Sequence, residues 1–212
     1  MGPVRRPALV LTAVLTAVAG LLGWRLAAEA RVRVVEVGFW FEEVSFRSTR
    51  LGHPLTSEDL VRVQAVARAE LARAFDGLRI RVTDNRDARY RVRVVQTVLD
   101  ARMRRPIHVA GQSRGMAGFG GGGVVNFELL ASGAVVYAPP ALDRPGVIDA
   151  IGRGIGRAAV HEFTHQLLPR APIHATRDRS SYEFYSAGRV EQYIGEMRWA
   201  LAGPLLHARL AR

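Results

Sequence analysis

The sequence contains one run with the residue types and spacing of a reactive site, His161-Glu162-Phe163-Thr164-His165. In an α-helix, residues four apart lie one above the other on the same face. His161 and His165 can therefore each direct one imidazole nitrogen to a single metal ion. A carboxylate beside them, that of Glu162, can accept a proton from a water molecule that the metal polarises. The run predicts a zinc site with Glu162 as the general base.

A third protein ligand is expected, because a catalytic zinc ion is usually held by three side chains and one water molecule. The chain contains no cysteine, so this ligand must be His, Asp or Glu. His174 follows the run after a turn at Pro169, and we favour it as the third ligand. The alternatives that the sequence leaves open are Glu183, Glu191 and Asp178.

The run lies near the end of a predicted long helix. From Pro145 to Leu168 apolar residues recur at helical spacing, among them Ile148, Ile151 and Ile155. The two histidines fall at the rim of this apolar stripe and Glu162 near its centre. The pattern therefore predicts a carboxylate that faces a packed interior.

Strands and one helix are expected ahead of the site. A helix should begin at Thr56 or Ser57, where acidic residues follow a capping side chain, and end at Gly77. β-branched and aromatic residues predict strands at Val32 to Phe41, Leu78 to Val82 and Tyr90 to Val98. The order strand, helix, strand, strand indicates an α+β domain.

The stretch between these strands and the histidine helix is rich in glycine. Gly111 to Gly123 predicts a flexible loop, and Val124 to Leu130 and Gly133 to Ala138 predict two short extended pieces. The second piece is followed by Pro139-Pro140, which suits an edge strand. After the histidines, a helix carrying Glu183 and Glu191 is expected to run to Leu210.

The first 30 residues have the pattern of an export signal or a membrane anchor. Arg5 and Arg6 precede the apolar run Ala8 to Trp24, and Ala28-Glu29-Ala30 offers a cleavage site. Residues 31–212 should then form one domain outside the cytoplasm. This domain would be secreted or periplasmic after cleavage, and tethered to the membrane through its N-terminal segment otherwise.

The chain is strongly basic, with a net charge of +11, and all 30 basic residues are arginine. A basic patch can attract nucleic acid or anionic lipid. Here the arginines are scattered among apolar and acidic residues, as at Arg31, Arg33, Arg89 and Arg91. We therefore interpret them as a solvated surface and expect no nucleic-acid partner.

Residues 161 to about 185 resemble the site of the zincin superfamily of metallopeptidases, in particular its metzincin branch and predicted exported bacterial peptidases with an H-E-x-x-H run. The expected order of elements over residues 32–212 is similar as well. The spacing to the third histidine is three residues longer than in metzincins. The resemblance implies a mixed twisted sheet with an edge strand, packed on a long histidine-bearing helix and a C-terminal helix. It also implies that His161, His165 and His174 bind Zn²⁺ and that Glu162 is the catalytic base.

The expected function is that of a zinc-dependent hydrolase that cleaves a peptide or protein substrate. In zincins the substrate backbone often pairs with the edge strand, for which Gly133 to Ala138 is the candidate. One alternative is a non-catalytic, membrane-tethered binding domain that keeps the zincin-like fold. Another is a zinc hydrolase with a different substrate, because fold and metal do not determine the substrate.

Overall fold

The computed structural model describes residues 34–100, 105–116 and 120–211. The predicted export or anchor segment, residues 1–30, lies outside this part of the chain. Residues Val35–Arg212 form a compact unit. Within the described residues, no helix is both long enough and apolar enough to cross a membrane.

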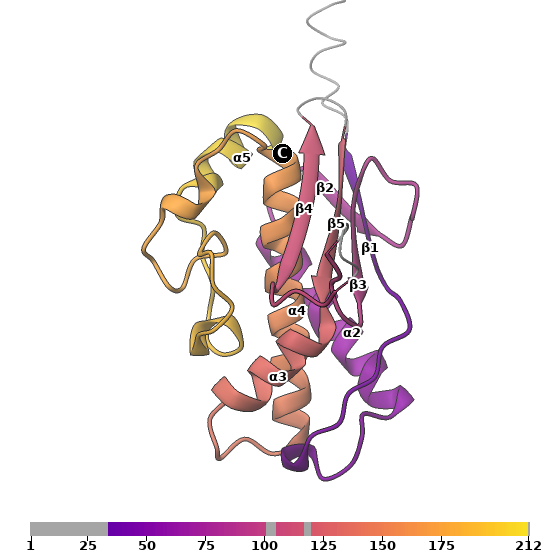
Figure 1. Ribbon diagram of the computed structural model, residues 1–212. Coiled ribbons are helices and arrows are strands. Elements are labelled where there is room, and N and C mark those ends of the chain that lie inside the picture. Colours follow the sequence, from indigo (N-terminus) through magenta and orange to yellow (C-terminus); the bar gives the residue numbers. More distant parts are fainter. Residues whose placement is uncertain (1–33, 101–104, 117–119, 212) are drawn as a thin grey trace, which may run out of the picture. The chain divides into compact units, whose positions relative to one another are not determined.

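A five-stranded mixed sheet forms one layer of this unit, with the strand order β2-β1-β3-β5-β4 (Figure 1). The first four strands in that order are parallel to one another, and β4 runs antiparallel to β5 at the edge. The strands are β1 (Val35–Phe41), β2 (Ile80–Thr83), β3 (Tyr90–Val95), β4 (Gly111–Met116) and β5 (Gly120–Asn126).

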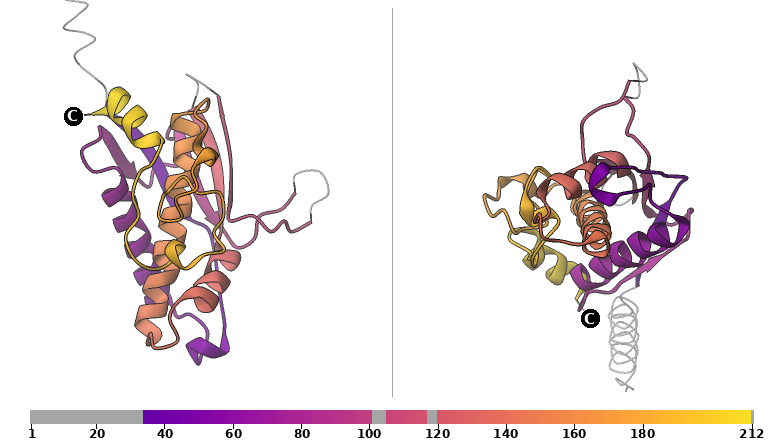
Figure 2. Two further views of the ribbon diagram at one scale, coloured as in Figure 1. Left: turned by 90° about the vertical axis from the view of Figure 1, so that its left-hand side faces the viewer. Right: turned by 90° about the horizontal axis from the view of Figure 1, so that it is seen from below.

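The second layer is helical. The long helix α4 contacts β3, β4 and β5, while α2 packs against α4 and reaches β2 (Figures 1 and 2). The helices are α2 (Ser57–Ala74), α3 (Phe127–Tyr137), α4 (Arg144–Leu167) and α5 (Ala202–Leu210). Short 3-10 turns occur at η1 (Thr49–Leu51), η2 (Ile173–Ala175) and η3 (Val190–Gln192). The expected α+β class is therefore confirmed.

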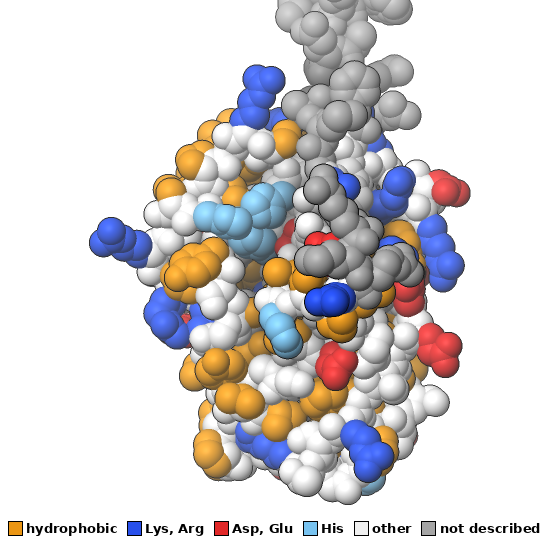
Figure 3. All heavy atoms as spheres, in the orientation of Figure 1, with side chains coloured by type: hydrophobic (Ala, Val, Ile, Leu, Met, Phe, Trp, Pro, Cys, Tyr) orange, Lys and Arg blue, Asp and Glu red, His pale blue; other side chains and the backbone are white. Residues whose placement is uncertain are grey.

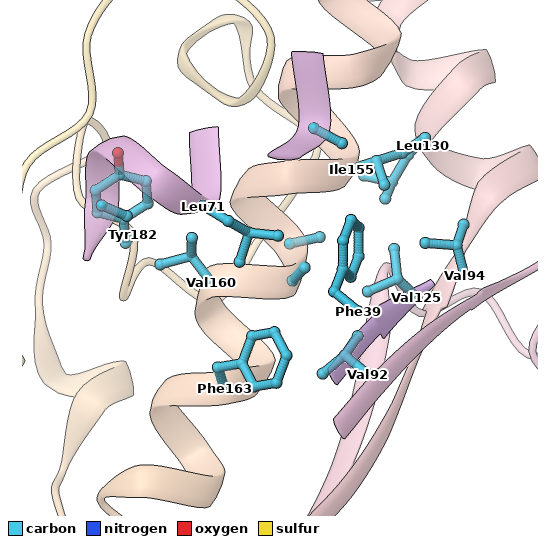
Figure 4. Close-up of a cluster of buried hydrophobic side chains, with 14 of the residues drawn as sticks. Phe39, Leu71, Val92, Val94, Val125, Leu130, Ile155, Val160, Phe163 and Tyr182 are labelled. Carbon is cyan, nitrogen blue, oxygen red and sulfur yellow. The ribbon is translucent and has the colours of Figure 1, made fainter. Parts of the chain in front are cut away.

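The core lies between these two layers. Inward-facing side chains of the sheet, including Phe39, Val92 and Val125, meet Ile155 and Phe163 of α4 (Figure 4). Along β3, buried and exposed residues alternate, so one face of the sheet is packed and the other is open. The packing of α4 against this apolar face fixes the position of the histidine run relative to the sheet.

The predicted helix ahead of the site is confirmed, and its start is the expected one. The Thr56 side chain accepts a hydrogen bond from the Asp59 N–H at 3.2 Å, and the Asp59 carboxylate accepts one from the Thr56 N–H at 2.8 Å. This reciprocal pair satisfies two backbone donors that the first turn of a helix leaves unpaired. The helix ends at Ala74, three residues before Gly77.

The loop predicted at Gly111 to Gly123 is wrong, because this stretch contains strands β4 and β5. Two of its glycines lie where a neighbouring element approaches closely, α4 at Gly121 and β4 at Gly123. A Cβ atom at Gly121 would lie 2.6 Å from Cγ of Gln166, and one at Gly123 would lie 2.5 Å from Oγ of Ser113. Glycine in a strand often marks such a close approach.

The extended pieces predicted at Val124 to Leu130 and Gly133 to Ala138 are also largely wrong. Asn126 ends β5, and its side chain accepts a hydrogen bond from the Leu129 N–H, which starts α3. The buried residues of α3, Phe127, Leu130, Ala131 and Ala134, recur at helical spacing. The edge strand is β4 and not Gly133 to Ala138.

The C-terminal helix is shorter than expected. The α-helix covers only Ala202–Leu210, and the segment before it is irregular except for the turn η3; Glu183 lies in the irregular part and Glu191 in η3. The Glu183 carboxylate accepts hydrogen bonds from the backbone N–H groups of Ala200, Leu201 and Ala202 at 2.6–2.9 Å. Two of these groups, those of Leu201 and Ala202, are donors that the first turn of α5 leaves unpaired, so Glu183 acts as a distant cap of this helix.

A buried arginine joins the helical layer to this irregular segment. The Arg157 guanidinium lies 3.3 Å from the Glu70 carboxylate, and the two side chains are 0% and 2% exposed. The same guanidinium donates to the backbone carbonyls of Glu191 and Gly195 at 2.8 and 2.6 Å. Arg157 therefore connects α4, α2 and the C-terminal segment.

Replacing Arg157 with Met is expected to lower the free energy of unfolding by about 3–5 kcal/mol, because it removes the buried partner of Glu70 and leaves this buried carboxylate with the exposed Arg73 alone. Urea denaturation measures this change. The matched control is Arg62→Met, which removes the Arg62–Asp149 ion pair between the same two helices; these side chains are 51% and 25% exposed. The control should cost at most about 1 kcal/mol. Equal losses in the two variants would contradict the structural role of Arg157.

Candidate metal centre

Three imidazole rings meet at one point of the structure. Nε2 of His161 lies 2.9 Å from Nε2 of His174 and 3.2 Å from Nε2 of His165. The third distance, between His165 and His174, is 3.1 Å. His161 and His165 come from the last turns of α4, and His174 comes from the turn η2 that follows. These three residues can hold a metal ion.

The protonation of His161 agrees with metal binding. Its Nδ1 atom lies 2.8 Å from the backbone carbonyl oxygen of Tyr182. A carbonyl oxygen only accepts, so Nδ1 carries the proton and Nε2 presents its lone pair to the other two rings. Burial lowers the pKa of His161 to about 4, which keeps the ring neutral. Such a hydrogen bond to the far nitrogen is typical of metal-binding histidines.

The donor set fits zinc. Two ligands of a tetrahedral zinc ion, each at roughly 2.0–2.1 Å, lie about 3.3–3.4 Å apart. The Nε2 atoms are 2.9–3.2 Å apart, so a displacement of a few tenths of an ångström brings them to that geometry. Three neutral imidazoles are also among the common protein ligand sets of zinc.

Hydrogen bonds of two buried side chains, Arg189 and Gln192, fix the segment that carries the Tyr182 carbonyl. The buried Arg189 side chain donates to the carbonyl of Ser181 at 3.1 Å and to the side-chain oxygen of Gln192 at 3.2 Å. The Gln192 amide in turn donates to the Gly154 carbonyl of α4 at 2.9 Å. The partner of His161 is thus connected back to the helix that carries His161.

Glu162 is buried beside the histidines. It is 5% exposed, and it faces the first residue of the edge strand β4, Gly111. Burial raises the pKa of its carboxyl group to about 7. The predicted carboxylate at the helix–sheet interface is therefore present, next to the imidazole cluster.

Further polar residues attach this part of α4 to the sheet. The Gln166 amide donates to the Arg91 carbonyl at 3.1 Å and to Ser113 Oγ at 3.0 Å, and its oxygen accepts from the Arg91 N–H. Ser113 Oγ also donates to the Glu162 carbonyl at 3.1 Å. The sequence offered one signal for Gln166, a polar residue within an apolar stripe. It offered none for Ser113.

The alternative third ligands have other partners. The Glu183 side chain is fully buried and occupied by the three N–H groups at the start of α5. Glu191 pairs with Arg179, and Asp178 pairs with Arg198 at 2.8 Å. Of the four candidates, only His174 belongs to the histidine cluster of the described residues.

A pocket of about 640 Å³ surrounds the cluster. Its walls are the start of β4, one face of α3, the end of α4 and the segment from Tyr182 to Tyr193. Histidine side chains gather on the face of the molecule seen in Figure 3. His108 is exposed and lies at the wall of this pocket. The histidine cluster is therefore accessible to a ligand from the solvent.

Comparison with known proteins finds no family model, no characterised protein and no solved structure that matches the chain. The chemical interpretation of the pocket therefore depends on its own geometry. That geometry consists of three converging imidazoles, a buried carboxylate and an antiparallel edge strand beside them.

Gly111 leaves the space that the Glu162 side chain fills. A Cβ atom at this position would lie 2.5 Å from Oε1 and 2.9 Å from Cδ of Glu162. Gly111→Ala is therefore expected to lower the free energy of unfolding by about 1–3 kcal/mol, as overpacking does. The control is Gly122→Ala on β5, where the nearest atom to the new Cβ is Nε of Arg91 at 3.8 Å. Chemical denaturation should show no comparable loss in the control.

Proposed function

We propose that this protein is a zinc-dependent peptidase with a zincin-like fold. The observation that carries the proposal is the convergence of three Nε2 atoms within 3.2 Å of one another, in a pocket that the buried Glu162 also lines. The order of elements supports the likeness in fold. A mixed sheet, an antiparallel edge strand and a long histidine-bearing helix follow one another, and the third histidine comes just after them.

In the proposed mechanism, His161, His165 and His174 hold the ion. When bound, zinc supplies a Lewis acid that lowers the pKa of a water molecule and polarises a carbonyl group. Glu162 accepts the proton of the attacking water and later returns it to the leaving amine. The Tyr182 carbonyl keeps the His161 ring in one tautomer and orientation.

The edge strand β4 supports a peptide as the substrate class. Within the described residues, β4 has a neighbouring strand on one side only. Its residues Gly111, Gln112 and Ser113 line the pocket of the histidine cluster. An extended peptide can pair with the open backbone of such a strand, and this pairing gives affinity with little sequence selectivity. A peptide bound in this way would lie next to the proposed base, Glu162.

We also propose that the domain works outside the cytoplasm. The support is the sequence pattern of residues 1–30, in which two arginines precede an apolar run and an Ala-x-Ala site. An uncleaved segment would tether the domain to the membrane, and cleavage would release it.

The direct test combines metal analysis with a cleavage assay on the purified full chain. Elemental mass spectrometry should find one zinc ion per chain, and a library of quenched fluorescent peptides should be hydrolysed. A chelator should stop hydrolysis, and added zinc should restore it. Zinc binding without cleavage of any peptide would favour the non-catalytic binding domain or a different substrate. Absence of zinc after reconstitution would overturn the proposal.

A further inference from the structure

The sheet face that the helices leave open carries an unusual row of residues. In this row, Arg91 of β3 pairs with Gly122 of β5, and Gly122 pairs with Arg114 of β4. Neighbouring strands are about 4.8 Å apart, so the two arginines stand roughly 10 Å apart with a bare backbone between them. This width suits an anionic oxygen group held between two guanidinium groups.

Packing does not account for the glycine in this row. A Cβ atom at Gly121 or Gly123, which face α4, would lie within 2.6 Å of another atom, whereas Gly122 points the other way. The nearest atom to a Cβ at Gly122 is Nε of Arg91, at 3.8 Å, and its backbone φ is not positive. The absence of a side chain at Gly122 therefore leaves the backbone between the two arginines uncovered.

The groove around this row is electropositive. It has a volume of about 570 Å³ and is lined by four arginines and one acidic residue, Asp87; the arginines are Arg86, Arg91, Arg93 and Arg114. Among the described residues, Arg93 forms an ion pair with Glu42 at 2.5 Å, whereas Arg91 and Arg114 form none. Their charges are thus available to an external anion.

Trp40 adds an amphipathic ring to the same face. It lies in the next row of the sheet, beside Arg93, which is followed by Val124. The Arg86 guanidinium lies 5.8 Å from the centre of the Trp40 ring. Tryptophan and arginine together are typical of protein surfaces that meet the headgroup region of a bilayer.

We propose that this open sheet face, defined by Trp40, Arg86, Arg91, Arg93, Gly122 and Arg114, docks on a bilayer of anionic phospholipids. The apolar run of the sequence ends at Trp24, and ten residues, 25–34, separate it from the start of β1 at Val35. A linker of that length spans at most about 36 Å. An inserted N-terminal segment would therefore keep the arginines close to the phosphate groups, which favours lipid over other polyanions.

Docking through this face leaves the histidine cluster accessible. The histidines lie on α4 and η2, and α4 packs on the opposite face of the sheet. The inference depends on the proposed membrane tether but not on the metal chemistry. Zinc content is therefore expected to be the same in variants of the open face, so the two proposals can fail separately.

The test uses a fluorophore on the open face. The chain contains no cysteine, so Val124→Cys creates a single labelling site there, and Val61→Cys creates a control site on α2, where Val61 is 65% exposed. The labelled full chain is inserted into vesicles of phosphatidylcholine alone or mixed with phosphatidylglycerol. The label at position 124 should shift to shorter emission wavelength only in the anionic vesicles, and raised salt should reverse the shift. The label at position 61 should not respond.

Replacing both Arg91 and Arg114 with Gln should reduce the ratio of docked to undocked protein roughly 30-fold. Arg47→Gln with Arg170→Gln removes the same charge from exposed positions elsewhere and should leave docking unchanged. An equal shift in neutral vesicles, or no shift in either kind, would overturn the proposal. A shift caused by single-stranded DNA in neutral vesicles would instead assign the face to nucleic acid.

Discussion

Glu162→Gln is expected to lower kcat/KM for peptide hydrolysis by on the order of 10²–10⁴-fold while zinc stays bound. The amide has nearly the shape of the carboxylate, so it fits the space that Gly111 leaves open. It cannot accept the proton of the attacking water at neutral pH. Metal content and peptide cleavage, measured on the same preparation, separate loss of the base from loss of the ion.

A matched control for this variant is Glu128→Gln. Glu128 is an exposed glutamate at the start of α3, and its carboxylate accepts a hydrogen bond from Thr97. It does not line the histidine pocket. The control should keep full activity. If Glu162→Gln also keeps full activity, the carboxylate is not the base and the proposed mechanism is wrong.

His174→Ala is expected to weaken zinc binding by more than the roughly 10–100-fold that follows loss of a hydrogen-bond partner of a ligand. The change removes one of three converging nitrogen atoms and leaves the two on α4 in place. A competition titration against a chelating dye measures the affinity. The rise in melting temperature that zinc causes should shrink in parallel, because an ion that binds more weakly stabilises the folded state less.

His108→Ala is the appropriate comparison, since this histidine lies at the wall of the same pocket but outside the cluster. It should bind zinc as the natural chain does. Undiminished zinc binding by His174→Ala would mean that the ion is held by other residues, and the carboxylates of Glu191 and Asp178 would then have to leave their arginine partners.

The parts of the fold with strong local signals were predicted from the sequence. The long helix around the histidines and the capped start of α2 are both present. The position of His174 next to the other two histidines was also expected, because a short turn can return the chain to the end of the same helix. In these segments, periodicity and capping act over a few residues and agree with the tertiary structure.

The structure of the glycine-rich segment, residues 111–123, could not be predicted from such local signals. Glycine usually signals a loop, but Gly121 and Gly123 are needed where α4 approaches the sheet, and that approach is a tertiary feature. The helix α3 was missed because Val135, Val136 and Tyr137 favour strands. The Asn126 cap and the spacing of Phe127, Leu130 and Ala134 favour the helix.

The irregular segment before α5 was missed for a further reason. Its conformation depends on single side chains such as Glu183 and Arg157, which bind backbone groups far away in the sequence. No local pattern predicts such contacts. They are nevertheless important for the site, because this segment supplies the carbonyl that orients His161.

The three histidines differ in how firmly the protein holds them. His161 and His165 stand on a helix packed against the sheet, whereas His174 lies exposed in a short turn between Pro169 and Thr176. An ion bound by all three rings therefore ties this turn to the rigid part of the molecule. Part of the binding free energy must offset the conformational entropy that the turn loses. Removing the ion should consequently expose the turn to proteases while the core stays folded.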